Sequence, residues 1–449
     1  MPNQNNNYRS AFVIVTVLFF MWGFITVLVD ALIPRLRDVF ELTYFQAGLV
    51  QFSFFTAYFV FSIPGGALIS KIGYKKGVVV GLIAMGAGCL LFYPAASFRM
   101  FPIFLMALFV LAGGITILQV AANPYVAALG PEETSSSRLN LSQAFNSLGT
   151  TIAPLVSAAF ILSNTVMGSE EVAALSGAQQ TAYYQAEASA VQGPFMVLAG
   201  VLLVLAIAFA LFNMPKILEG DDDKSGSYKR ALKIKHLMFG ALGIFVYVGA
   251  EVAIGSYLVN YFLDLDVAAL VEGSAVMTSI AAALSTVFSD TDIADMNASQ
   301  LAGTYVFFYW GGAMVGRFIG SALLQKLKAG NLLSVYAGVN IMLLIISMST
   351  GGLVAFWSIL CIGLFNSIMF PTIFTLAIKG INENTAQGSG ILCTAIVGGA
   401  IIPPLYGAIA DSFGLQIALI VPAVCYLYIM WYGKIGSKVE FKKIAEAKV

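Results

Sequence analysis

The chain has 449 residues, of which 59% are hydrophobic and only 10% are charged. An ordinary soluble domain carries about 25% charged residues, so a soluble fold of this length could not bury so much apolar surface. The formal net charge is 0, which leaves no basic surface for nucleic acid and indicates a protein whose solvent is partly lipid.

Twelve apolar segments are expected to cross a bilayer as helices, because about 20 residues at ~1.5 Å each span its hydrocarbon core. The first six are expected at 11–32, 44–70, 77–97, 101–129, 140–163 and 194–214. The second six are expected at 236–262, 301–325, 332–349, 352–377, 387–410 and 414–433. Two connecting segments, 164–193 and 263–300, carry several acids and no Lys or Arg and are expected to be long loops.

A charged segment, Pro215–Lys235, separates the two sets of spans. It divides the chain into an expected N-terminal half, 1–214, a cytoplasmic linker, 215–235, and a C-terminal half, 236–449. With both termini inside, most of the 23 Lys and Arg residues are cytoplasmic, and only Arg35, Arg37 and Arg99 lie in outer loops. This positive-inside bias predicts a multi-pass protein of a bacterial inner membrane with cytoplasmic termini.

Three short patterns of the first half recur about 250 residues later, each in the span six places further on. Such a consistent offset predicts a parallel duplication, which is typical of transporters built from two related halves. A substrate site is then expected between the halves, near the middle of the membrane. The pairs are 65–71 with 320–326, Gly149 and Pro154 with Gly399 and Pro404, and Gln119 and Pro124 with Asn366 and Pro371.

Longer motifs resemble a known family. The segment 62–77, SIPGGALISKIGYKKG, resembles the loop 2–3 signature of the major facilitator superfamily, although Ser70 stands where an acid is usual. Five further runs are similar to the fucose/galactose/glucose:cation symporter family, and the one at 245–261 is closest to its glucose/galactose branch. These runs are FQAGLVQ (45–51), AANPYVAALGPE (121–132), RLNLSQAFNSLGT (138–150), FVYVGAEVAIGSYLVNY (245–261) and FNSIMFPTIFTLAIKG (365–380).

The resemblance implies an all-α membrane protein with the major facilitator fold, in which twelve transmembrane helices form two pseudo-symmetric six-helix halves. It also implies cation-coupled symport of a hexose such as glucose or galactose by alternating access. No cofactor is expected beyond a co-transported Na⁺ or H⁺. The expected partners are the hexose and the lipid bilayer, and the chain is expected to act as a monomer.

Only two acids, Asp30 and Glu251, fall inside the expected spans, where an ionisable group is costly enough to be a functional candidate. Glu251 lies near the middle of its span, with Tyr247 one turn away on the same face. We expect Glu251 to bind the sugar or a cation, and a structural partnership with Arg317 is the alternative. The resemblance gives Asp30 the coupling role, and a solvated acid at the outer end of the span is the alternative.

Several carboxamides and two indoles complete the expected sugar site. A carboxamide both donates and accepts hydrogen bonds, which suits neutral sugar hydroxyls, although it can also join neighbouring helices. A tryptophan can stack on a sugar ring, although it can also pack against helices or mark the membrane interface. The candidates are Gln143, Asn146, Gln119, Asn366, Trp22 and Trp310.

The coupling ion depends on the surroundings of Asp30. The fucose branch carries a second acid where Gln119 stands, and Gln119 cannot titrate. One carboxylate among neutral oxygens suits a monovalent cation, and we expect Thr26, Gln119 and Asn123 to supply those oxygens. The loss of the second acid favours a sodium site near Asp30, with a proton as the alternative.

An enzyme is not expected, because the sequence contains no metal-ligand cluster, nucleophile elbow or phosphate-binding loop. Two other functions stay open for the same fold. One is a proton-coupled exporter of small amphipathic compounds, and the other is a sugar sensor that binds without transporting.

Overall fold

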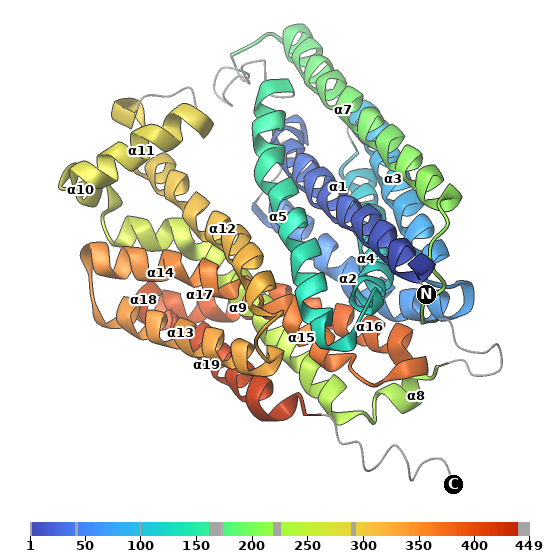
Figure 1. Ribbon diagram of the computed structural model, residues 1–449. Coiled ribbons are helices and arrows are strands. Elements are labelled where there is room, and N and C mark those ends of the chain that lie inside the picture. The colour runs from blue at the N-terminus through green and yellow to red at the C-terminus, as the bar shows by residue number, and fades with distance from the viewer. Residues whose placement is uncertain are drawn as a thin grey trace. The chain divides into compact units, whose positions relative to one another are not determined.

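The computed structural model describes residues 2–40, 44–98, 100–160, 172, 174–218, 226–288 and 293–438, and every regular element in these ranges is a helix (Figure 1). The chain before the linker forms α1 (Pro2–Phe40), α2 (Tyr44–Ile72), α3 (Tyr74–Phe98), α4 (Phe101–Ala128), η1 (Glu132–Thr134), α5 (Ser135–Phe160) and α7 (Gly177–Leu211). A short helix, α8 (Tyr228–Ala231), follows in the linker.

The chain after the linker is likewise helical. It forms α9 (Lys235–Asp264), α10 (Val267–Glu272), α11 (Ala275–Phe288), η2 (Ile293–Asp295), α12 (Ala298–Leu323), α13 (Ala329–Ser349), α14 (Gly352–Asn366) and α15 (Met369–Ala377). It continues with η3 (Asn382–Asn384), α16 (Thr385–Thr394), η4 (Ala395–Val397), α17 (Gly398–Phe413), α18 (Leu415–Ala418), α19 (Ile420–Trp431) and η5 (Tyr432–Gly436).

Ten segments of the described chain are long and apolar enough to cross a membrane. Three of them are interrupted helices: 352–377 contains α14 and α15, 382–413 contains α16 and α17, and 415–436 contains α18 and α19. The two other expected spans fall on α5 and α12. The all-helical, multi-pass architecture expected from the sequence is therefore present.

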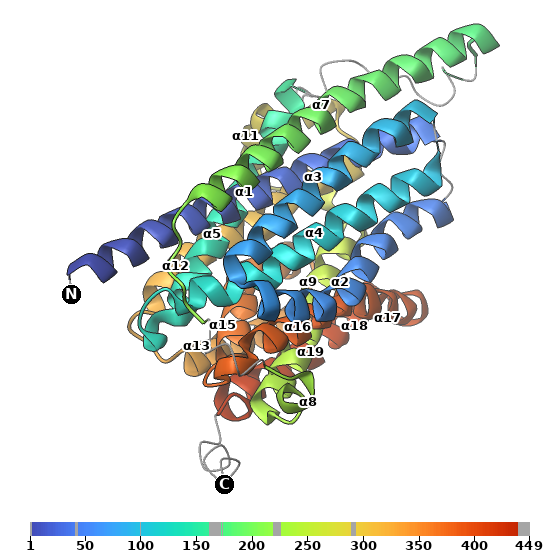
Figure 2. The same cartoon turned by 90° about the vertical axis from the view of Figure 1, so that its right-hand side faces the viewer.

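The chain forms two compact units, and segments from each half of the sequence contribute to both. The first unit contains 1–130, 145–228 and 383–394, and the second contains 131–144, 229–382 and 395–449. In the first unit, α3 packs between α4 and α7, and α2 packs on the other side of α4 (Figure 2). The helix α16 joins this unit by packing against α2 and α4.

A proline explains one contact of α16. Pro124 lies inside α4 and lacks the N–H that would bond the carbonyl of Val120, four residues earlier. The Ser389 hydroxyl on α16 donates to that carbonyl at 2.8 Å. The polar group freed by the proline is thus satisfied inside an apolar unit, as burial requires.

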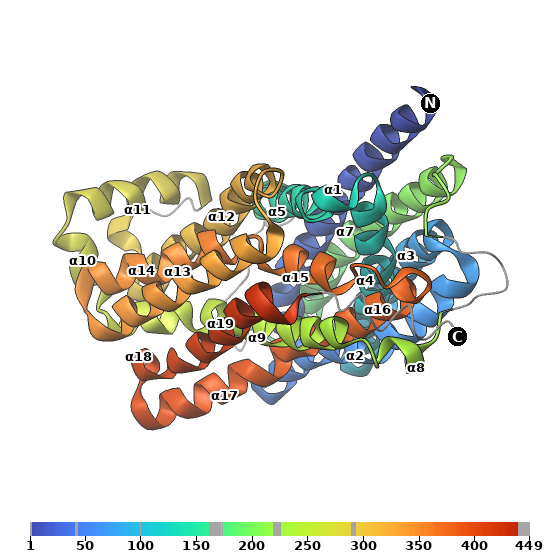
Figure 3. The same cartoon turned by 60° about the horizontal axis from the view of Figure 1, so that its bottom comes forward.

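In the second unit, α9 is the central helix, and α12, α15, α17 and α19 pack around it (Figure 3). The helices α12 and α14 approach each other especially closely. A Cβ added at Gly363 would overlap the Tyr309 carbonyl oxygen, so only glycine permits this spacing. Close approach at small residues is the usual way in which helices pack within membranes.

The two expected loops are partly helical. The helix α7 already begins at Gly177, and the backbone N–H of Ser176 just before it donates to the Gln179 side chain at 3.1 Å. In the second loop, Asp266 caps α10 and accepts from the Ala269 N–H at 3.4 Å. Alanine-rich stretches have high helix propensity, which explains why α11 forms where the acids suggested a loop.

Candidate functional site

The Glu251 carboxyl occupies the middle of α9, which places an ionisable group within a membrane-spanning helix of the second unit. The Tyr247 hydroxyl, one turn earlier, donates to Glu251 Oε1 at 2.8 Å. The Arg317 guanidinium of α12 also acts on this carboxylate electrostatically. A hydrogen bond to a charged acceptor is among the stronger ones in proteins, so the carboxylate is held in a defined position.

The Asn366 side chain ends α14 and is 0% exposed. Its Nδ2 donates to the Tyr309 hydroxyl at 2.9 Å, and its Oδ1 accepts from the Tyr426 hydroxyl at 2.7 Å and from Asn340 Nδ2 at 2.8 Å. Its backbone carbonyl accepts from the Tyr247 hydroxyl at 3.2 Å. Both ends of this carboxamide are therefore bonded to protein groups of the second unit.

The Trp310 indole lies beside the same region. Its ring meets the Tyr309 ring edge-on, with centroids 5.0 Å apart. A Cβ added at Gly255 would lie 2.9 Å from Trp310 Cζ2, so the indole rests on α9 one turn after Glu251. It is 47% exposed, which leaves much of the ring open to a ligand or to lipid.

Two carboxamides of α4 in the first unit are buried with polar atoms that have no partner among the described residues. Gln119 is 9% exposed and Asn123 is 0% exposed. Within the described part of the chain, Gln119 Oε1 and both polar atoms of Asn123 make no hydrogen bond. A buried polar group without a partner is costly, so atoms of this kind suggest a ligand or ion that is bound during function.

The remaining candidates of the first unit lie on α1 and α5. Asn146 Nδ2 donates to the Phe19 carbonyl at 2.9 Å, which joins α5 to α1. Trp22 is 7% exposed and packs on the Phe19 ring, and its carbonyl accepts from the Thr26 hydroxyl at 2.8 Å. The Asp30 position belongs to α1, but its side chain lies outside the described residues.

Within the second unit, the structure brings together some of the expected residues. Glu251, Asn366 and Trp310 form one connected group in the second unit, and Gln143 is buried on α5. No sequence pattern predicted Tyr309, Tyr426 and Asn340, which complete this group. In the sequence, each of these residues is marked only by a polar group within an apolar span. Many other tyrosines of this chain share that feature, so it could not single them out.

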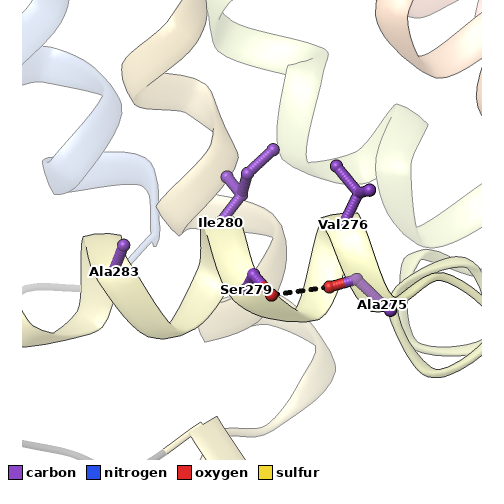
Figure 4. A pocket seen from close by; sticks show the side chains of 5 residues that line it. All are labelled: Ala275, Val276, Ser279, Ile280 and Ala283. Atoms are coloured by element: carbon purple, nitrogen blue, oxygen red, sulfur yellow. Dashed lines mark hydrogen bonds between the residues drawn. The ribbon is translucent and has the colours of Figure 1, made fainter.

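A shallow hollow of about 410 Å³ lies on α11 and is large enough for a small molecule (Figure 4). Five residues of this single helix line it: Ala275, Val276, Ser279, Ile280 and Ala283. Its only polar side chain, Ser279, donates to the Ala275 carbonyl of its own helix at 2.8 Å. The hollow therefore lacks the polar groups that would bind a sugar.

Comparison with known proteins identifies the family. The model of the Major Facilitator Superfamily matches residues 11–396, which is most of the chain. This chain belongs to the Major Facilitator Superfamily. It is therefore a membrane transporter rather than an enzyme, and the fold expected from the sequence is confirmed.

Relatives place the chain more closely within the superfamily. A glucose/galactose transporter of Brucella abortus is 51% identical over 440 residues, which cover 97% of this chain and 96% of that protein. The L-fucose-proton symporter of Escherichia coli is 34% identical and covers 97% and 95%, respectively. The crystal structure of the symporter FucP in the outward conformation matches with a TM-score of 0.85 and 33% identity, over 96% of this chain and 100% of that one. The resemblance to the fucose/galactose/glucose symporter family is thus confirmed, and identity is higher to its glucose/galactose member.

Proposed function

We propose that this protein imports a hexose such as glucose or galactose together with a monovalent cation, by alternating access across a bacterial inner membrane. Its relatives support the substrate class, since one is named a glucose/galactose transporter and another an L-fucose-proton symporter. The proposed orientation places both termini in the cytoplasm, as the positive-inside bias predicts. The proposed functional unit is a monomer.

The observation that carries this proposal is the grouping of Glu251 on α9 with the Trp310 indole of α12, which rests on α9 at Gly255, one turn after Glu251. A carboxylate accepts hydrogen bonds from sugar hydroxyls, and an exposed indole offers a flat face to a sugar ring. Tyr247 contacts Oε1 of the carboxylate, and we assign Oε2 to a sugar hydroxyl. A polar and aromatic pair of this kind inside an apolar helix bundle is suited to binding a small polyol.

Carboxamides are proposed to supply further hydroxyl contacts. Gln143 and Asn146 lie three residues apart on one face of α5, so both can contact one ligand. Asn146 also bonds α1, which gives it a structural role beside the proposed binding role. Gln119 and Trp22 stay candidate contacts, whereas the full set of protein partners of Asn366 favours a supporting role for that residue.

Asp30 is the proposed centre of cation coupling. The buried oxygens of Gln119 and Asn123, which have no partner among the described residues, are the neutral ligands proposed beside it, together with Thr26. Neutral oxygens and one carboxylate favour sodium, which remains the proposed ion. The proton is the second candidate, and it is favoured by the relative from E. coli, which is an L-fucose-proton symporter.

Uptake of radiolabelled galactose into proteoliposomes tests the proposal. Sodium and proton gradients are imposed separately, and sodium is replaced by choline at fixed pH. Accumulation that is lost in choline supports sodium, whereas accumulation that persists in choline and collapses with a protonophore supports a proton. Asp30→Asn should abolish accumulation with either ion, because the carboxylate neutralises the charge that would otherwise cross the lipid.

The same vesicles separate the alternative functions. A sugar sensor would bind galactose without accumulating it, and an exporter of amphipathic compounds would not respond to galactose. Binding without uptake in vesicles that hold an ion gradient would therefore contradict transport.

A further inference from the structure

The helix that contains Asn366 is broken at its centre. The helix α14 ends at Asn366 and α15 begins at Met369. Pro371 lacks the N–H that would bond the Ser367 carbonyl, and Arg317 Nε donates to that carbonyl at 3.2 Å. The Asn366 carbonyl at the end of α14 accepts from the Tyr247 hydroxyl. Side chains of α9 and α12 therefore satisfy the two carbonyls at the break.

Tyr247 connects this break to Glu251. Its hydroxyl lies 2.8 Å from Glu251 Oε1 and 3.2 Å from the Asn366 carbonyl oxygen, and it is 1% exposed. A phenol carries one hydrogen, so the two acceptors compete for it. A charged carboxylate is the stronger acceptor, and anything that neutralises or engages Glu251 shifts the hydrogen toward Asn366.

We propose that Tyr247 is a positioning residue that links the state of the Glu251 carboxyl to the break between α14 and α15. When the carboxylate is free, it holds the Tyr247 hydrogen and the Asn366 carbonyl is weakly bonded. When a sugar hydroxyl donates to the carboxylate, the hydrogen turns to Asn366 and tightens the end of α14. The sugar step rests on the proposed function, whereas the competition for one hydrogen does not.

The neighbouring groups favour this competition. Arg317 of α12 acts on Glu251 electrostatically, and two further hydroxyls, those of Tyr309 on α12 and Tyr426 on α19, lie at the Asn366 side chain. Asn366 holds both of these tyrosines through its side chain. The Tyr309 hydroxyl, which accepts from Asn366, donates to the Glu251 backbone carbonyl at 3.3 Å. Asn366 is thus fixed in place, and the Tyr247 hydrogen is the group that can turn.

A double-mutant cycle read by hydrogen–deuterium exchange tests the proposal on the full chain in nanodiscs. The peptide 365–372 reports the break in wild type, Glu251→Gln, Tyr247→Phe and the double variant, all without sugar. The neutral amide of Glu251→Gln is a weaker acceptor than a carboxylate, so exchange at the break should slow by about threefold or more, as expected for one gained hydrogen bond. The same substitution should have no effect once Tyr247→Phe is present.

Tyr261→Phe is the matched control, since Tyr261 is a buried tyrosine of the same helix that bonds Ser347 instead. It should leave exchange at the break and its response to Glu251→Gln unchanged. An equal effect of Glu251→Gln with and without Tyr247→Phe would overturn the link. Saturating galactose should also slow exchange in wild type but not in Tyr247→Phe. Failure of galactose uptake in proteoliposomes would instead overturn the proposed substrate. The double-mutant cycle without sugar would still test whether Tyr247 links Glu251 to the break.

Discussion

Two segments join a carboxamide to a proline five residues later: Gln119–Pro124 within α4 and Asn366–Pro371 across the break between α14 and α15. They share this spacing but differ in how their polar groups are used. In each, the carbonyl freed by proline is bonded by a neighbouring helix, through Ser389 in the first unit and Arg317 in the second. The side chains differ. Those of Gln119 and Asn123 keep buried atoms without partners in the described chain, whereas the Asn366 carboxamide is bonded at both ends.

This difference distinguishes carboxamides that are proposed to bind a ligand from a carboxamide that supports the surrounding structure. A buried carboxamide that is bonded at both ends already has its desolvation cost offset and stabilises the fold. A buried carboxamide whose atoms lack partners is costly unless a ligand or ion completes it. The region around α4 is therefore the proposed place for the coupling ion, and the region around Asn366 is the proposed support for Glu251.

The largest effect should come from Asn366→Leu, which removes the partner of the Tyr309, Tyr426 and Asn340 side chains. Each buried group left unsatisfied costs about 1–3 kcal/mol, so the free energy of unfolding should fall by several kcal/mol. Denaturant unfolding in detergent measures this change. Asn260→Leu, at an exposed position of α9, is the control and should have little effect. A stability close to wild type would show that the Asn366 bonds are dispensable.

Glu251→Gln should lower the initial rate of galactose uptake by roughly tenfold or more, the effect expected from losing a hydrogen bond to a charged group. The melting temperature should change little, because glutamine keeps the shape of the side chain. Proteoliposome uptake and thermal denaturation measure the two quantities. Glu272→Gln removes an exposed acid of α10 and should leave both unchanged. Normal uptake kinetics in Glu251→Gln would mean that the charge is not needed.

Gln143→Ala and Asn146→Ala should each weaken galactose binding by about 1–3 kcal/mol, the cost of one lost hydrogen bond in a desolvated site. Asn146→Ala should also lower stability slightly, because the Phe19 carbonyl loses its donor. Equilibrium binding of labelled galactose to purified protein measures the affinity. Equal affinity in wild type and both variants would remove these residues from the proposed site.

The helical architecture was predictable because long apolar runs have few alternatives in a membrane. Glu251 was predictable for a related reason, since a charge within such a run is too costly to be incidental. The helix α11 was not expected, because its small apolar residues lie in a segment whose acids suggested a loop.

The partners of the site residues could not be predicted in the same way. Tyr247 lies one turn from Glu251, so its contact follows from helix geometry. Tyr309, Tyr426 and Asn340 reach Asn366 from three other helices, and no local pattern encodes those contacts. Asn366 and Gln119 were therefore both expected to contact the sugar, and Gln119 also the coupling ion, although only Asn366 is bonded to protein groups at both ends of its side chain.

The proposal that Asn123 binds the coupling ion and Asn366 supports the fold is tested most directly by the free energy of unfolding. It is measured for Asn123→Leu and Asn366→Leu, with and without sodium. Leucine replaces buried atoms that have no partner in the described chain, so stability without sodium should stay within about 1 kcal/mol of wild type or rise. Any stabilisation that sodium gives to wild type should disappear in Asn123→Leu and persist in Asn366→Leu. A loss of several kcal/mol without sodium, as large as that of Asn366→Leu, would show that Asn123 supports the fold and would contradict its assignment to the ion site.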